Sequence, residues 1–600
     1  MLIAMRSCLR GIRLFAACFC LILLCSELDA KSDAVDYAPV RDAVSQLIRK
    51  EMSRNDVTGL SIALVDDQKV VWAQGFGYAD EKKEISATPE TVYRIGTLTN
   101  LFTVAAALQL AEQSALDLDQ PVQRYLPEFT IRSRSLSAGL IPVRSLMTHH
   151  SGLPANLLKG MWSSKPGPFT DVVRLIKEEY APYPPGYLFS QSAVNMSLVG
   201  HVVERTSGRA YTAFMEDSLL QPLGMVRSGF LSSGRADSIV SRGYRKGKEI
   251  AEPLSRDLPA AGLSSTVTDL SRFMQMVFSQ GMANGRQVLK PGTIAEMLRP
   301  QNANVPLDLG LTAGLGWMLG GLGDIDIRNA GTVAHLSGAT LVFHSQMIVL
   351  PEHRLGVVVL ANSSTSGRMA SRAAVEAITR ALEAKTGIKQ PVQVRAAESG
   401  DPLSREMLKD YVGSYASMAG LAEINARSDH FHAEVMNRTL QLGLLKNNRF
   451  NVKYRVWGLI PISLGDVDFI EISRRNVAGH EILVASLKGR DLLIAEKIVP
   501  SPVSAAWIKR AGEYRIENLG DDFPLLETVR LRFENNMLLA ECEAPFFYKG
   551  AVRFPLRTMS DTEAIIEGLG RGMGETVRAV RENGKEELRY SGYVLRRKDE

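Results

Sequence analysis

The stretch from Thr91 to Asp119 constrains the fold more than any other part of the sequence. It reads TVYRIGTLTNLFTVAAALQLAEQSALDLD, which predicts a short strand, a turn at Gly96 and then a long helix. The helical part is rich in Ala, Leu and Gln, which are good helix formers. One face of this helix is apolar, because apolar residues recur there at helical spacing: Leu101, Val104, Ala105, Leu108 and Ala111.

Length and composition favour a protein of several globular domains. A chain of 600 residues is too long for one hydrophobic core, so we expect two or three domains. A hydrophobic content of 45% and a charged content of 22% are ordinary for such a chain. The net charge of +5 is small, and Lys and Arg form no dense run. The sequence therefore gives no sign of a nucleic-acid partner or of a polybasic membrane surface.

Residues 1–30 have the order of a secretory signal peptide. Arg6, Arg10 and Arg13 precede an apolar run, and Ala30 is a plausible cleavage point. The apolar run is short for a membrane span, so an uncleaved anchor is the alternative interpretation. We therefore expect an exported protein, periplasmic or secreted, with no other transmembrane span.

The cysteines and histidines indicate neither a disulfide nor a metal site. Four of the five cysteines lie in the predicted signal peptide, so only Cys542 remains after cleavage. The nine histidines are scattered, and no Cys/His cluster has the spacing of a metal site. We expect no metal and no other cofactor.

Residues 34–389 read as one domain with both helices and strands. A first helix is predicted over residues 36–55 and a hairpin over 58–80. Helices dominate the middle, including one entered through Pro185-Gly186 within 184–200. Two apolar strands follow in 340–362, and a last helix runs from about 367 to 384. Lys385-Thr386-Gly387 ends that helix and is interpreted as a helix stop.

Residues 390–402 read as a linker, and the remainder is patterned as β-structure. Short alternating runs predict two small antiparallel barrels, over 403–500 and 504–600. Each begins with a Gly-x-Tyr motif, at Gly413 and Gly512, which are 99 residues apart. The spacing suggests a duplicated unit.

The landmarks of residues 34–389 resemble the serine β-lactamase and penicillin-binding protein family. They include the Thr91–Asp119 stretch, IPVRSLMTHHSGLP at Ile141–Pro154 and YTAFMEDSLLQPLGM at Tyr211–Met225. The branch is that of class C β-lactamases, esterases and D-aminopeptidases. The resemblance implies an α+β fold, an antiparallel sheet with a helical subdomain. The two barrels resemble the lipocalin-like domains that follow the catalytic domain in D-aminopeptidases.

The first motif of that family, S-x-x-K, falls on Thr97-Leu98-Thr99-Asn100. In the family the Lys lies over the Ser hydroxyl, so that this nucleophile can lose its proton. Thr97 keeps a hydroxyl, but the amide of Asn100 cannot take a proton. The second motif, Y-x-N, falls on Gln191-Ser192-Ala193. A Gln cannot relay a proton as a phenolate does, and Ala193 cannot bind a substrate amide.

The third motif is a His or Lys, a small residue and Gly, and it falls on Leu336-Ser337-Gly338. His335 lies one residue early, and a shift of one residue on a strand points a side chain to the opposite face. A bulge could restore it to the site. The oxyanion hole of the family uses backbone N–H groups, which survive changes of side chain. His149 and His150 are interpreted as structural residues near a turn.

Three departures in three separate segments favour a pseudo-enzyme that binds a peptide, a cell-wall fragment or a partner protein. The candidate catalytic positions are Thr97, Asn100, Gln191 and His335, and the candidate binding positions are Ala193, Ser337 and Gly338. The alternative is an active hydrolase of esters or amides, with Thr97 as nucleophile and His335 as base. A third hypothesis places the function in the barrels.

Overall fold

The computed structural model describes residues 35–134, 139–231, 240–323, 325–392, 397–399, 404–426, 431–456, 460–462 and 469–598. The predicted signal peptide lies outside the described residues. Within the described ranges, we find no helix whose length and apolar character would suit it to cross a membrane.

The first domain is built on an antiparallel sheet of eight strands within the described residues. Strand β1 pairs with β2 on one side and β17 on the other, and the β1–β2 pairing confirms the predicted hairpin. The order across the sheet is β13 (Thr312–Ala313), β14 (Met318–Leu319), β15 (Ala334–Ala339), β16 (His344–Leu350), β17 (Leu355–Ala361), β1 (Gly59–Asp66), β2 (Lys69–Asp80) and β3 (Ile85–Ser86).

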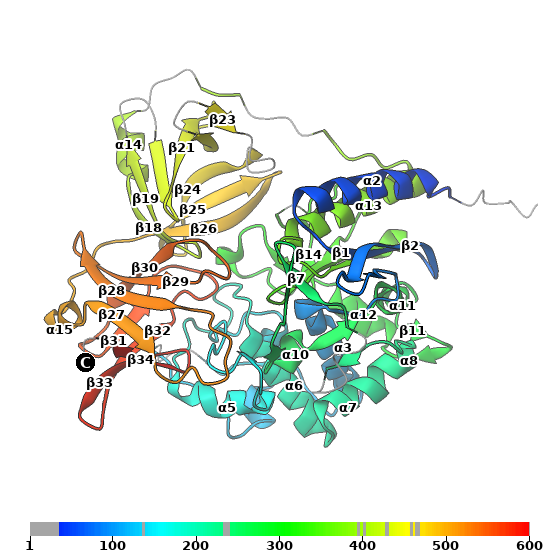
Figure 1. The fold of residues 1–600 in the computed structure, drawn as a ribbon, viewed down its shortest axis with the longest axis horizontal. Helices are drawn as coiled ribbons and strands as arrows, with labels where there is room; N and C mark the ends of the chain where they lie inside the picture. Colours follow the sequence, from blue (N-terminus) through cyan, green and yellow to red (C-terminus); the bar gives the residue numbers. More distant parts are fainter. Residues whose placement is uncertain are drawn as a thin grey trace, which may run out of the picture.

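Helices α2 (Ala38–Arg54) and α13 (Gly367–Thr386) cover one face of this sheet (Figure 1). The face of α13 that packs on the sheet is mostly alanine and is fully buried, which lets the helix approach closely. Helix α13 ends at Gly387, whose φ of +77° is left-handed and suits glycine. The interpretation of Lys385-Thr386-Gly387 as a helix stop is confirmed.

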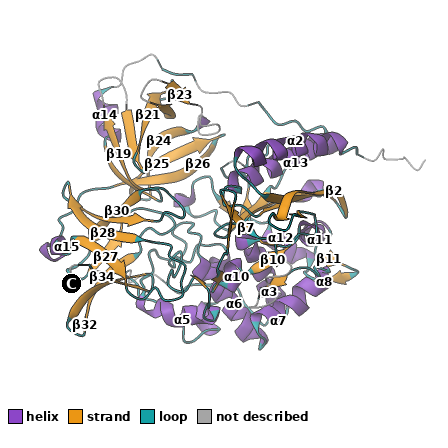
Figure 2. Ribbon diagram, viewed as in Figure 1, coloured by secondary structure: helices purple, strands orange, loops and turns teal. Residues whose placement is uncertain are grey.

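The other face carries the helical subdomain (Figure 2). Its helices are α3 (Thr99–Glu112), α4 (Val143–Met147), α5 (Val172–Leu175), α6 (Ala193–Ser207), α7 (Tyr211–Met215), α8 (Gln221–Leu223), α10 (Leu258–Ala261), α11 (Val267–Phe278) and α12 (Pro291–Met297). Short strand pairs join these segments: β4 (Tyr93–Arg94) and β6 (Gly229–Phe230) with β10 (Leu263–Ser265), β5 (Trp162–Ser163) with β9 (Leu254–Ser255), β7 (Gly243–Arg245) with β8 (Lys248–Ile250), and β11 (Met282–Ala283) with β12 (Arg286–Gln287).

Two sequence predictions about helices need correction. Helix α3 is buried on all sides from Thr99 to Leu108, not on one face, because α6, α7 and α10 surround it. Helix α6 begins at Ala193 rather than at Pro185-Gly186. The side chain of Ser192 accepts a hydrogen bond from the Asn195 amide and so caps this helix.

Two closed barrels of eight strands follow, beside the first domain (Figure 1). The first begins at α14 (Arg405–Tyr411) and comprises β18 (Gly413–Ser417), β19 (Gly420–Ala426), β20 (Phe431–Val435), β21 (Arg438–Leu444), β22 (Phe450–Val456), β24 (Glu471–Val477), β25 (His480–Leu487) and β26 (Arg490–Lys497), with β23 (Ile460–Ile462) added on β22. The second begins at α15 (Ala505–Lys509) and comprises β27 (Gly512–Ile516), β28 (Thr528–Glu534), β29 (Met537–Glu543), β30 (Ala551–Thr558), β31 (Glu563–Ile566), β32 (Thr576–Glu582), β33 (Lys585–Tyr590) and β34 (Tyr593–Arg597).

The starts of the two barrels have the same local structure. The Tyr415 hydroxyl donates to the backbone oxygen of Tyr411, and the Tyr514 hydroxyl donates to that of Arg510, both at 2.8 Å. In each barrel a serine side chain also caps the short helix just before these residues. The shared geometry supports the predicted duplication.

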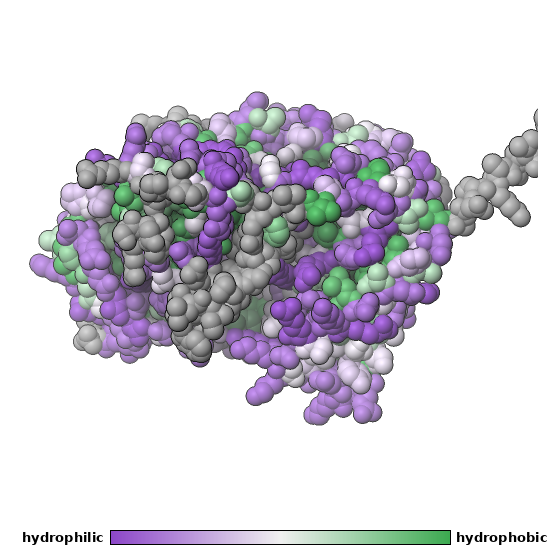
Figure 3. Space-filling model, turned by 90° about the horizontal axis from the view of Figure 1, so that it is seen from above, coloured by the Kyte–Doolittle hydropathy of each residue, from purple (hydrophilic) through white to green (hydrophobic). Residues whose placement is uncertain are grey.

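The second barrel is docked on the first domain by charged and polar contacts. Asp522 Oδ2 accepts from Lys159 Nζ at 2.7 Å and from the Gly160 amide at 2.8 Å. Glu575 Oε1 accepts from the Ala155 amide at 2.9 Å. These contacts hold the loops β27–β28 and β31–β32 against residues 155–160. Over the coloured part of the face in Figure 3, hydrophilic side chains predominate and hydrophobic ones form separate patches.

Candidate functional site

A cleft of about 640 Å³ lies between the start of α3, the edge of β15 and loops of the second barrel. Six of the seven predicted site residues line it: Thr97, Asn100, Gln191, Ala193, Ser337 and Gly338. They come from three distant segments of the sequence, and the fold brings them to one place. His335 is not among the lining residues.

Two glycines allow β15 to lie directly against the turn that carries Thr97. A Cβ on Gly338 would lie 2.2 Å from the backbone oxygen of Ile95, and one on Gly96 would lie 2.6 Å from the backbone of Ala339. Gly96 also has a left-handed φ of +54°. The turn Gly96–Leu98 is therefore held at the strand edge, with Thr97 half-exposed and facing the cleft.

The hydroxyl of Thr97 has no base beside it within the described residues. The neighbouring polar side chains are committed elsewhere. Thr99 Oγ1 donates to the Gly96 oxygen at 2.7 Å, and the amide of Asn100 lies 3.4 Å from the ring of His149. Asn100 is 2% exposed, and its side chain cannot accept a proton at ordinary pH.

His149 forms the floor beneath the start of α3. Its Nδ1 accepts from the Ser192 amide and from Asn195 Nδ2, both at 3.3 Å. The proton of the neutral ring is therefore on Nε2, which faces Asn100. In the described structure Asn100 Oδ1 is a buried oxygen without a hydrogen-bond partner. The Nε2–H tautomer therefore favours the orientation of the amide in which Oδ1 accepts from Nε2–H of His149.

The ring of His149 is neutral at physiological pH. Burial lowers its pKa to about 3, and the charges of His150 and Arg571 lower it further. Both ring nitrogens face neighbours other than Thr97. The sequence analysis assigned His149 a structural role near a turn, but it missed the contact with Asn100. No local signal could have revealed a contact between residues 49 positions apart.

The structure does not bring His335 to Thr97. Strand β15 pairs with β16 without a bulge, and His335 lies opposite Ile348, which packs in the core beneath α2 and α13. His335 therefore points away from the cleft, as a shift of one residue predicts. Burial lowers its pKa to about 4, so it is a neutral core residue at physiological pH. The hypothesis of His335 as a base is wrong for this arrangement.

A loop of the second barrel enters the cleft. Arg571, between β31 and β32, donates from Nη1 to Gln191 Oε1 at 3.4 Å. Apolar side chains from two other loops of the same barrel also line the cleft: Leu525, Leu526, Ala544 and Phe547. Sequence reasoning missed Arg571, because residues 380 positions apart in different domains carry no shared local pattern.

Comparisons with known proteins agree with this architecture. Residues 44–381 match the sequence model of the family described as Beta-lactamase, which is more than half of the chain. The chain belongs to the β-lactamase family. Protein flp of Staphylococcus aureus strain N315 is 25% identical over 325 residues, 53% of this chain and 62% of that protein. The human protein named Putative beta-lactamase-like 1 is 27% identical over 334 residues, 53% of this chain and 64% of that protein.

Two solved structures show a similar fold over a longer span of the chain. The octameric penicillin-binding protein homologue from Pyrococcus abyssi has a TM-score of 0.52 and 23% identity, and it covers 75% of this chain and 99% of its own. SurE, solved with D-Leu, has a TM-score of 0.54 and 22% identity, and it covers 77% of this chain and 100% of its own. The chain spans less than two thirds of the length of the curated relatives it matches.

The cleft of this β-lactamase family member is positively charged. Its charged lining residues are Arg368 and Arg571, and no Asp or Glu lines it. His344 lies on the wall, with Nε2 3.2 Å from the Ser364 oxygen, and burial lowers its pKa. The His344 ring is therefore neutral at neutral pH, and the positive charge of the lining residues comes from arginine alone.

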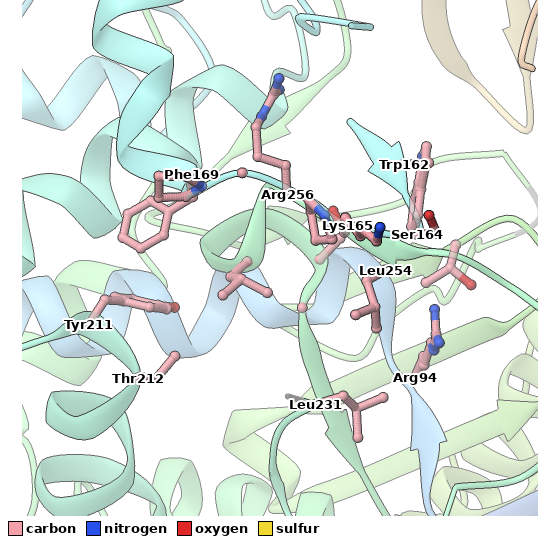
Figure 4. Close-up of a pocket in the computed structure, with 18 of the residues that line it drawn as sticks. Arg94, Trp162, Ser164, Lys165, Phe169, Tyr211, Thr212, Leu231, Leu254 and Arg256 are labelled. Atoms are coloured by element: carbon pink, nitrogen blue, oxygen red, sulfur yellow. The ribbon is translucent and has the colours of Figure 1, made fainter. Parts of the chain in front are cut away.

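A second cavity of about 580 Å³ adjoins the cleft (Figure 4). Phe169 and Tyr211 lie at one end of it, and Trp162 and Arg94 lie at the other. Trp162, Ala261 and Thr340 line both cavities, so the two meet at the Trp162 end. The second cavity therefore shares a wall with the cleft, and its lining combines these aromatic residues with the charged residues Arg94, Lys165, Glu204 and Arg256.

Proposed function

We propose that this β-lactamase family member is an exported protein that binds a peptide or a cell-wall fragment in the cleft without turning it over. A protein partner that inserts a short segment is the other form of such binding. The observation that carries the proposal is the surrounding of the Thr97 hydroxyl, with which no described side chain able to take a proton forms a hydrogen bond.

Loss of the base removes the main source of nucleophile activation. A hydroxyl remains protonated at neutral pH, so it needs a base within hydrogen-bond reach. Removing one member of such a catalytic unit costs on the order of 10³-fold or more in rate. His149 does not replace the base, since its low pKa makes it a weak acceptor and its Nδ1 already accepts two hydrogen bonds.

The elements needed for binding are kept. The cleft has a volume typical of a site for a small peptide. Glycines at positions 96 and 338 hold the turn against the strand edge, where backbone N–H groups can receive a carbonyl or carboxylate. The backbone of the site is therefore suited to binding a ligand, while the side chains at the catalytic positions Asn100 and Gln191 cannot take up a proton.

An active hydrolase with Thr97 as nucleophile is the alternative function. The half-exposed Thr97 and the neutral ring of His344 both line the cleft. These two residues are the nucleophile and the proton acceptor that such an enzyme would need. A bound substrate could reorganise the wall and bring a base into reach.

Intact-mass analysis separates the two functions. The mature protein is incubated with a penicillin, a chromogenic ester and a fluorophosphonate, beside Thr97→Ala and Thr97→Ser. We expect no adduct and no turnover with wild type or Thr97→Ala. An adduct that forms on wild type and vanishes in Thr97→Ala would refute the proposal and establish acyl transfer. Thr97→Ser has the less hindered nucleophile, and it reports whether the missing base alone prevents reaction.

A thermal-shift screen then tests binding. The probes are D-Leu, N-acetyl-D-Ala-D-Ala and muropeptides, and D-Leu is chosen because SurE was solved with it. We expect a ligand-dependent rise in Tm that Thr97→Ala leaves unchanged, because ligand bound to the native state stabilises it by mass action. Mass spectrometry of the periplasmic and medium fractions tests export and the cleavage near Ala30.

A further inference from the structure

We propose that the second barrel completes the cleft as an anion-binding site, in which Arg571 binds a free carboxylate of the ligand. The inference rests on the proposed binding function and specifies the chemistry of the ligand. The ligand class is a small peptide or an N-acyl amino acid with an unblocked carboxylate and apolar side chains.

Arg571 is an unpaired cation in the described structure. It forms no ion pair with a described residue, and its contact is the neutral amide oxygen of Gln191 at 3.4 Å. Arg571 is a solvent-exposed residue of the cleft lining, and Glu575 is the carboxylate whose charge acts on it. The Glu575 carboxylate is already bound, however, by the Ala155 amide at 2.9 Å and the Tyr590 hydroxyl at 2.8 Å.

The cleft around Arg571 offers no alternative counter-charge. None of its lining residues is acidic. A guanidinium stays charged at every accessible pH and donates two parallel hydrogen bonds to a carboxylate. The site therefore attracts an anion and repels a free amine.

Arg571 is held in place before a ligand binds. The loop that carries it is anchored by Glu575 on the Ala155 amide, and Tyr183 donates to the Gly568 oxygen of the same loop at 3.2 Å. Gln191 holds the guanidinium itself. Preorganisation of this kind reduces the ordering cost of binding.

The position of Arg571 also orients the ligand. Its guanidinium contacts Gln191, and the amide of the next residue, Ser192, donates to His149. Arg571 therefore lies toward the end of the cleft where Asn100 contacts that ring. Leu525, Leu526 and Phe547 of the same barrel line the cleft with it. A carboxylate on Arg571 would place the rest of the ligand among the apolar side chains of the cleft that Thr97 also lines.

Paired titrations test the inference. The probes are N-acetyl-D-Ala-D-Ala and N-acetyl-D-Leu, each as the free carboxylate and as the carboxamide, measured by calorimetry on the full-length mature protein. We expect the carboxylate to bind the wild type about tenfold or more tightly than the carboxamide. Arg571→Gln should remove this difference. Arg571→Lys should retain part of it, because lysine keeps the positive charge but cannot donate the two parallel hydrogen bonds of a guanidinium.

The matched control is Arg581→Gln. Arg581 is exposed on β32 of the same barrel and does not line the cleft. This variant should bind the probes as the wild type does. Thermal unfolding of all variants shows whether each is folded, so that a loss of affinity in Arg571→Gln is not a loss of structure.

The outcomes are distinct from those of the proposed function. Equal affinity for carboxylate and carboxamide, no binding of either at millimolar concentration, or unchanged carboxylate affinity in Arg571→Gln would each overturn the inference. Equal affinities or an unchanged Arg571→Gln would still leave ligand binding established. A covalent adduct at Thr97 would refute the proposed function, while the carboxylate and carboxamide titrations would still decide the role of Arg571.

Discussion

His149 should make the protein lose stability as the pH falls below neutral. Its pKa is about 3 in the folded protein and 6.5 without burial. Above pH 6.5 the ring is neutral in both the folded and the unfolded chain, so it does not change the unfolding free energy with pH. Below pH 6.5 the ring is protonated in the unfolded chain, but in the folded chain it stays neutral until the pH is near 3. The stability is therefore lost progressively between those two values.

The magnitude follows from the size of the pKa shift. Each pH unit in this interval costs about 1.4 kcal/mol of unfolding free energy. Lowering the pH from 6.5 to 5 therefore costs about 2 kcal/mol from this residue alone, and the whole interval costs about 5 kcal/mol. The first of these figures is already a large part of the 5–15 kcal/mol that stabilises a typical domain.

Urea unfolding of the wild type and His149→Gln at a series of pH values measures the effect. Glutamine keeps one donor and one acceptor but does not titrate. The variant should be less stable at pH 7 and should lose stability more slowly on acidification, by about 1.4 kcal/mol per pH unit between pH 6.5 and 5. Hydrogen exchange of the α3 amides reports the same comparison for the first domain alone. Parallel pH profiles for the two proteins would refute the assignment of a buried, neutral His149.

Two further substitutions test the packing of the site. Gly338→Ala places a Cβ 2.2 Å from the Ile95 oxygen and should destabilise the protein by about 3 kcal/mol or more in thermal unfolding, whereas Gly292→Ala, with no atom within 4 Å, should change stability by less than about 0.5 kcal/mol. Asn100→Lys should lower stability by about 3 kcal/mol or more, since it buries an ammonium with no acidic partner lining the cleft. A Tm of Asn100→Lys equal to that of the wild type would show that the position tolerates a charge.

The order of the elements in the first domain could be predicted from the sequence because its signals are local. The hairpin β1–β2 follows from two apolar runs around a polar turn, and the end of α13 follows from Gly387. Six of the seven predicted site positions also lie in one cleft, and His335 does not. What failed was any property set by distant packing, such as the burial of every face of α3 and the start of α6 at its Ser192 cap.

The same physical reason explains what was missed at the site. The role of His149 depends on a contact across 49 residues, and that of Arg571 depends on how a separate barrel docks through Glu575. Neither contact leaves a periodic pattern in the sequence. The sequence allowed two positions for His335: away from the cleft on a regular strand, or toward it at a bulge. Only the regular β15–β16 register decided for the first.

The proposed loss of catalysis and the proposed anion site have a common electrostatic cause. A lysine at position 100 would be a buried cation in a cleft that already holds Arg571 and whose lining contains no carboxylate. With Arg571 in place, a neutral side chain at position 100 avoids that repulsion. Asn100 can instead exchange a hydrogen bond with a neutral His149, whose low pKa Arg571 itself helps to maintain. In the proposed function, the barrel arginine would thus favour a neutral side chain at position 100, which cannot transfer a proton, and it would supply the charge that favours binding of an anion.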